Sequence, residues 1–143
     1  MDYLHTGLNT QLGFVEVDYS PEAVHLDMPV TDACMQPFGY VHGGATLTLL
    51  EAAASWGARL RCDLQTHRPF GTHMDVHHVR ACTQGTVHGA AVLSDEQDLG
   101  PKGTRQVWDV SATDDAGNLL SVGTFTTRIV SLSYLQSKES ATM

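Results

Sequence analysis

The chain of 143 residues has the length of a single domain, which is enough to bury one hydrophobic core. Hydrophobic residues make up 42% of it and charged residues 17%, a composition of folded globular proteins that excludes a disordered chain. The formal net charge of -8 argues against nucleic-acid and anionic-membrane partners, because both are captured by a basic field.

Targeting and disulfide signals are missing from the sequence. The first ten residues lack the basic and apolar regions of a secretory leader, and no stretch approaches the ~18 apolar residues of a membrane span. Cys34, Cys62 and Cys82 form neither an even set nor a C-x-x-C pair, so we expect reduced thiols without a chemical role. These features predict a cytoplasmic protein.

The first half of the chain is expected to form a hairpin, a loop and a helix. Apolar residues tend to alternate over residues 13–30, and residues 20–22 separate two short strands. Residues 31–41 contain a proline and a glycine and have no period, which indicates a loop with a role in function. Helix formers without proline then predict the one long helix, from residue 45 to about 60, with small residues that let a sheet pack closely.

The second half is predicted to form four strands, over residues 74–82, 86–94, 105–113 and 119–130. The connections at residues 84–85, 100–103 and 114–118 have compositions typical of hairpin turns. Together with the first half, this pattern predicts an α+β fold, an antiparallel sheet of five to six strands wrapped around one long central helix. We expect one domain over residues 1–135 and a flexible polar tail over residues 136–143.

The segment 36–55 carries the residues with chemical potential. Gly43 and Gly44 precede the predicted helix, where unpaired N–H groups and the helix dipole favour an anionic oxygen and glycine lets it come close. Glu51 follows two turns later among alanines and leucines, with no polar face around it. We therefore interpret it as a functional carboxylate rather than a solvated one.

The same segment resembles the HGG-type signature of hotdog-fold acyl-CoA thioesterases of the PaaI-like superfamily. In that family a Gln precedes the HGG, a Glu lies nine residues after the His, and a Ser or Thr follows one turn later; Gln36, His42, Glu51 and Ser55 occupy these positions. The branch that it resembles contains the Arthrobacter-type 4-hydroxybenzoyl-CoA thioesterase and the proofreading thioesterase of enterobactin synthesis. The resemblance implies a hotdog fold.

A looser likeness lies in the predicted strand after the helix. Residues 75–80, Asp-Val-His-His-Val-Arg, look like the family's Asn-x-x-His-His-Arg-Pro run without its proline. The resemblance implies substrate-binding roles for His78 and Arg80 in this strand, and for Phe38 and Gly44 near the HGG. It implies no metal and no cofactor besides the coenzyme A that the substrate carries.

By resemblance, the protein hydrolyses an acyl-CoA to a free acid and coenzyme A. The two glycines polarise the thioester carbonyl, Glu51 acts as nucleophile or as general base for water, and the remaining motif residues, Gln36, His42 and Ser55, orient substrate or water. From the residues alone, His42 could equally be a helix-entry residue bonded to the backbone. For Ser55 the alternative is a small residue that packs on the helix.

The spacing within the motif predicts an oligomer. Gly43 and Glu51 are eight residues apart, about 12 Å along a helix, so one chain cannot bring both to one carbonyl. Two helices packed antiparallel about a two-fold axis would bring Gly43 of one subunit opposite Glu51 of the other. We therefore expect a homodimer with shared sites, and the family's assembly implies a homotetramer.

Other interpretations stay open. His73, Asp75 and His77 fall on one face of a strand and could bind a metal, although a surface stripe explains them equally well. A hotdog dehydratase or hydratase would place its carboxylate differently, and a non-catalytic acyl-CoA-binding domain would lose Glu51. For the acyl group, the resemblance favours an aromatic or bulky one, such as 1,4-dihydroxy-2-naphthoyl, hydroxybenzoyl or phenylacetyl, and medium-chain fatty acyl groups stay open.

Overall fold

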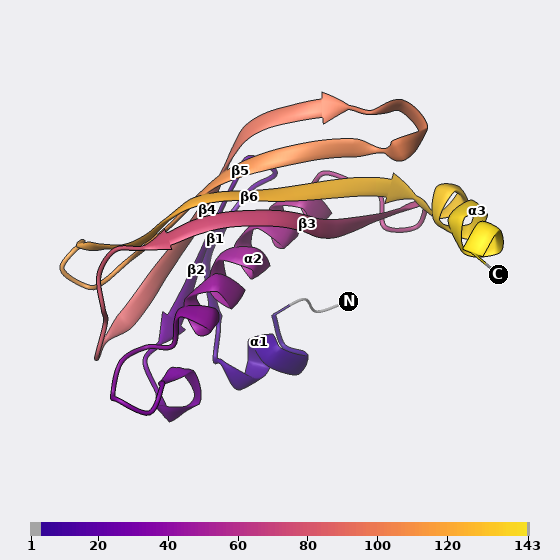
Figure 1. Ribbon diagram of the computed structural model, residues 1–143. Helices are drawn as coiled ribbons and strands as arrows, with labels where there is room; N and C mark the ends of the chain where they lie inside the picture. The colour runs from indigo at the N-terminus through magenta and orange to yellow at the C-terminus, as the bar shows by residue number, and fades with distance from the viewer. Residues whose placement is uncertain (1–3, 143) are drawn as a thin grey trace.

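The computed structural model describes residues 4–142, in which six strands form one antiparallel sheet around one long helix. This helix, α2 (Gly43–Leu60), lies against one face of the sheet, which curves over it (Figure 1). The strands are β1 (Val15–Tyr19), β2 (Ala23–Pro29), β3 (His67–His78), β4 (Thr86–Asp98), β5 (Thr104–Thr113) and β6 (Leu119–Ser131). The predicted α+β hotdog architecture is confirmed.

The order of strands in the sheet is β1-β2-β4-β5-β6-β3. The predicted hairpin at residues 84–85 is wrong, because β3 pairs with β6 and the chain then crosses over to β4, between β2 and β5. β3 also begins seven residues before the predicted start, at His67, and ends four residues before the predicted end, at His78. The turns at residues 100–103 and 114–118 join paired antiparallel strands, as predicted.

The small residues of α2 let the helix lie directly on the sheet. The helix residues with 0% exposure are Leu49, Leu50, Ala53, Ala54 and Ala58. The Trp108 ring of β5 fills the space over Gly57, where a Cβ built on the glycine would lie 2.4 Å from the ring atom Cη2. Gly57 therefore sets how closely the helix and the sheet can approach.

A series of hydrogen-bonded polar side chains connects the sheet with the C-terminal end of α2. The Trp108 Nε1–H donates to the Thr127 hydroxyl over 2.9 Å, and that hydroxyl donates to Gln106 Oε1 over 2.9 Å. The Gln106 amide then donates to the Glu96 carboxylate over 3.1 Å. Glu96 also accepts from Arg61 just beyond α2, and this bond is the main cause that lowers the pKa of Glu96. Since Gln106 and Thr127 are fully buried, their polar groups need these partners.

Short helical segments complete the described chain. They are α1 (Gly7–Gln11), η1 (Asp32–Cys34), η2 (Gly100–Lys102) and α3 (Leu132–Thr142). Neither α1 nor α3 was predicted, and α3 includes most of the residues that were expected to form a flexible tail. The division into a domain over residues 1–135 and a mobile tail stays a prediction. Along the part of the chain that the structure covers, no helix has both the length and the apolar character to cross a membrane.

Replacing Gly57 with alanine should lower the free energy of unfolding by about 1–3 kcal/mol, because the added methyl group meets the buried Trp108 ring. Urea denaturation of the variant and the wild-type protein measures this difference. Trp108→Phe removes the ring atoms nearest to the methyl group, so the two changes should be non-additive when combined. Equal stability of Gly57→Ala and the wild type would contradict the packing described above.

Candidate active site

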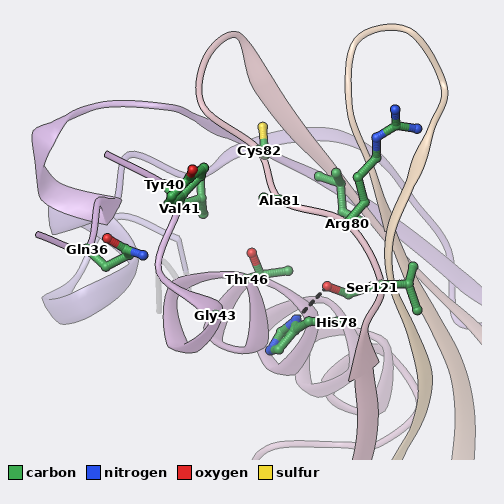
Figure 2. Close-up of a pocket in the computed structure, with 12 residues that line it drawn as sticks. Gln36, Tyr40, Val41, Gly43, Thr46, His78, Arg80, Ala81, Cys82 and Ser121 are labelled. Carbon is green, nitrogen blue, oxygen red and sulfur yellow. Dashed lines mark hydrogen bonds between the residues drawn. The ribbon is translucent and has the colours of Figure 1, made fainter. Parts of the chain in front are cut away.

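A cavity of about 470 Å³ lies at the N-terminal end of α2 (Figure 2). Its walls come from the loop before α2, the first turns of α2, the end of β3 with the segment that follows, and the start of β6. Four residues that the sequence analysis singled out line it: Gln36, Gly43, His78 and Arg80. The remaining lining residues are Tyr40, Val41, Thr46, Val79, Ala81, Cys82, Leu120 and Ser121.

His42 caps the N-terminus of α2. Its Nδ1 accepts a hydrogen bond from the Gly44 N–H over 2.9 Å. The ring therefore acts as a helix-entry residue, one of the two interpretations of the sequence, and the Gly44 N–H is occupied. The Gly43 N–H, at the first helical position, has no acceptor among the residues that the structure describes. At this end of the helix the Gly43 N–H, and not the Gly44 N–H, is therefore open to a ligand oxygen.

Gln36 and Phe38 lie in the loop in front of the cavity. The Gln36 Oε1 accepts a hydrogen bond from the Phe38 N–H, which leaves the Gln36 amide nitrogen available as a donor. Phe38 is 83% exposed and is not part of the cavity wall. A binding role for Phe38 therefore requires a ligand, or a second chain, that reaches beyond the cavity.

His78 stands beside the first residue of α2 (Figure 2). Its Nδ1 is 2.7 Å from the Ser121 hydroxyl oxygen of β6. Its Nε2 faces Gly43, where a built Cβ would lie 2.8 Å from that nitrogen, so a side chain at position 43 would displace the ring. The sequence analysis missed Ser121, although Phe125 and Thr127 on the same inward alternation of β6 could have indicated that it is buried.

Arg80 lies at the rim of the cavity, with its guanidinium directed away from α2 (Figure 2). It lies near the turn between β5 and β6, where Asp114 has a pKa below its usual value. The main cause is the hydrogen bond from the Asn118 side chain, and the charge of Arg80 adds to it. Arg80 thus places a positive charge at the mouth of the cavity, partly balanced by Asp114.

Glu51 and Ser55 lie further along α2 and do not line the cavity. The Glu51 carboxylate is exposed, and no hydrogen bond or ion pair joins it to another described residue. Its Oε1 lies 3.3 Å from a Cβ built on Gly71 of the edge strand β3. The expectation that Glu51 is not solvated is therefore wrong for the single chain, because α2 packs on the sheet through its other side. Ser55 is half-buried, which fits either interpretation of it.

The cavity is not lined by His73, Asp75 or His77. Of the three cysteines, Cys82 lines it and the other two do not. His77 and Asp75 are largely exposed, with 3.7 Å between Nε2 and Oδ1. Within residues 4–142, no three His, Cys, Asp or Glu side chains gather as a metal ion would require. All three cysteines are free thiols, and burial raises the pKa of Cys62.

Comparison with known proteins identifies the family of the chain. Residues 12–129 match a family model described as a domain of unknown function (DUF4442). A Listeria monocytogenes protein named 1,4-dihydroxy-2-naphthoyl-CoA hydrolase is 31% identical over 116 residues, which are 81% of this chain and 89% of that protein. An Escherichia coli protein of the same name is 29% identical over 127 residues, which are 87% of this chain and 89% of that protein.

Solved structures of a Staphylococcus aureus thioesterase share the fold. A variant with a glutamine replaced by alanine has a TM-score of 0.80 and 30% identity, covering 87% of this chain and 99% of that chain. A variant of the same protein with a glutamate replaced by alanine has a TM-score of 0.81 and 31% identity, covering 88% and 100%. The chain therefore belongs to the DUF4442 family and, by its fold and relatives, to the hotdog-fold thioesterases.

Replacing His42 with alanine should lower the free energy of unfolding by about 1 kcal/mol, because it removes the cap of α2. His42→Asn keeps a side chain that caps helices well and should keep the stability. Urea denaturation of both variants separates the capping role from any role in chemistry. Equal losses in the two variants, or no loss with alanine, would show that the ring is not the cap.

Proposed function

We propose that the protein hydrolyses an acyl-CoA thioester to a free acid and coenzyme A, in a site shared between two chains. The observation that carries this proposal lies along α2, which begins in the cavity with the unoccupied Gly43 N–H and carries the exposed Glu51 two turns later. Thioester hydrolysis needs a donor for the developing oxyanion and a carboxylate for the attack. It needs no strong acid, because a thiolate leaves readily.

A second chain is required to complete this pair of groups. Gly43 and Glu51 are eight residues apart, about 12 Å along α2. A second copy with its α2 antiparallel would bring its own Glu51 to the cavity. The edge strand β3 supports such a partner, since it has 12 residues, exposes Phe70 and Met74, and runs beside Glu51. We therefore propose a homodimer with two equivalent sites, which pairs further into a homotetramer.

In the general-base route, the Glu51 carboxylate takes a proton from water while the water oxygen adds to the thioester carbonyl carbon. The carbonyl oxygen becomes negative and accepts a hydrogen bond from Gly43 of the other chain. The C–S bond then breaks, coenzyme A leaves as the thiolate, and the proton on Glu51 returns to it. In the nucleophilic route, Glu51 attacks the carbon itself, the C–S bond breaks and coenzyme A leaves as the thiolate. Water then hydrolyses the resulting mixed anhydride, which releases the acid and regenerates Glu51. In either route Gln36, His42 and Ser55 orient water or substrate, and neither a metal nor a cofactor is required.

The relatives support these assignments. In the two Staphylococcus aureus variants, the replaced glutamine and glutamate are fifteen residues apart, as are Gln36 and Glu51 in this chain. The Listeria and Escherichia coli relatives are named for hydrolysis of 1,4-dihydroxy-2-naphthoyl-CoA. We propose an aromatic or bulky acyl group, with this thioester as the first candidate, and a cytoplasmic location. The residues proposed to contact the substrate are Phe38, His78 and Arg80; Gly44 is not retained, because its N–H is bonded to His42 and it does not line the cavity.

Replacing Glu51 with glutamine should lower kcat/KM by about 10²–10⁴-fold, because an amide of the same shape can neither attack nor accept a proton. Gln36→Ala and His42→Asn should cost less, since positioning groups share their task with the Gly43 N–H. Release of free thiol from a panel of acyl-CoA substrates measures all three variants.

Activity of Glu51→Gln within a few-fold of the wild type, in a folded protein, would remove Glu51 from the mechanism. A wild-type protein that binds acyl-CoA without turnover would instead indicate a non-catalytic acyl-CoA-binding domain.

Mixing two inactive variants should restore activity if the site is shared. Gly43→Pro removes the N–H donor at a helical position that accepts proline and displaces the neighbouring His78 ring of the same chain, while Glu51→Ala removes the carboxylate. A heterodimer of the two retains one site with both groups intact. After random exchange of subunits in equal amounts, the mixture should show about a quarter of the wild-type activity.

The matched control is a chain with both changes, mixed with wild-type chains. A shared site predicts that these heterodimers are inactive, because each of their two sites lacks one group. If the single variants stay inactive after verified exchange while wild-type chains keep their activity beside the double variant, the site lies within one chain.

A further inference from the structure

The Ser121 hydroxyl has a single hydrogen-bond partner in the described chain. Ser121 is 2% exposed, on the same inward alternation of β6 as Phe125. It lies opposite His78 of β3, and its hydroxyl oxygen is 2.7 Å from His78 Nδ1. Over residues 4–142, no other group shares a hydrogen bond with this hydroxyl. Within the described chain, the direction of the hydroxyl proton therefore depends on the His78 ring.

The burial of Ser121 selects the tautomer of His78. A hydroxyl that accepted from an Nδ1–H would have to turn its own proton toward the cavity, whereas donation to Nδ1 satisfies that proton within the protein. With the hydroxyl as donor to Nδ1, a neutral His78 ring carries its proton on Nε2. Nε2 is the atom that faces Gly43 (Figure 2). In this tautomer the ring presents an N–H donor next to Gly43.

We propose that the His78 Nε2–H is a further donor of the oxyanion site, and that Ser121 is the positioning residue that fixes its tautomer and orientation. This inference rests on the proposed thioester hydrolysis. His42 already occupies the Gly44 N–H, so the other donors at this end of the cavity are the Gly43 N–H and the Gln36 amide. A further preorganised donor stabilises the charge as it develops.

No proton changes place at either donor during this step. The carbonyl oxygen gains negative charge when the carbonyl carbon is attacked, and it accepts hydrogen bonds from Gly43 and His78. The charge returns to the carbonyl when the C–S bond breaks, and both N–H groups keep their protons.

The tautomer can be measured without substrate, by nitrogen-15 NMR of the histidine rings. Ser121→Thr and Ser121→Val have nearly the same shape and differ in the hydroxyl, so each controls for the packing effect of the other. The wild type and Ser121→Thr should carry the His78 proton on Nε2, whereas Ser121→Val should shift the signal toward the Nδ1–H form. An unchanged tautomer in a folded Ser121→Val protein would overturn the role of Ser121.

Kinetics on an acyl-CoA substrate gives the second readout. Ser121→Val should lower kcat by about tenfold with little change in KM, and Ser121→Thr should restore most of the loss. His78→Ala should lower kcat by about 10²–10³-fold, the cost of one oxyanion donor, while His78→Gln keeps an N–H and should lose less. In the His78→Ala background, Ser121→Val should cost nothing further.

Three results would overturn the inference: Ser121→Thr as slow as Ser121→Val, full additivity of the His78 and Ser121 changes, or wild-type kcat in His78→Ala. A wild-type protein inactive on every acyl-CoA tested would contradict the proposed hydrolysis instead. In that case the NMR measurement would still decide whether Ser121 sets the His78 ring.

Discussion

The fixed separation of Gly43 and Glu51 on a rigid helix is the constraint on which the proposed chemistry depends. α2 is an unbroken helix of 18 residues whose small and apolar face is buried against the sheet. Just beyond its C-terminal end, Arg61 pairs with Glu96 of β4, which fixes that end as well. No bend can therefore shorten the distance of about 12 Å between the donor and the carboxylate. In the proposed mechanism a second chain therefore supplies the group that one chain lacks.

The packing of α2 also decides which way its carboxylate can point. The sheet covers the side of the helix that carries Leu50 and Ala54, so a charged side chain is accommodated on the side that faces the edge strand β3. Gly71 of β3 leaves room beside the Glu51 carboxylate. The features that make the sheet close tightly over the helix thus place the carboxylate at the edge where a second chain would dock.

Local patterns were sufficient to predict most elements, including α2, which begins two residues before its predicted start. They could not predict the crossover from β3 to β4. The composition of a turn indicates that the chain changes direction, but it does not indicate which strand the next strand pairs with. In the site, the helix-entry glycines indicated Gly43, and the resemblance to the thioesterase signature indicated Gln36. Ser121 has no local signature, since its contact with His78 exists only where β6 lies beside β3. The exposure of Glu51 likewise depends on which side of α2 the sheet covers.

The most direct measurement is a crystal structure with an acyl-CoA analogue in which a methylene group replaces the thioester sulfur. A shared site predicts that the analogue's carbonyl oxygen accepts a hydrogen bond from Gly43 of one chain. Its carbonyl carbon should then face the Glu51 carboxylate of the second chain. A carbonyl group that contacts Gly43 with no Glu51 of another chain beside it, or that lies away from the N-terminus of α2, would contradict the shared site.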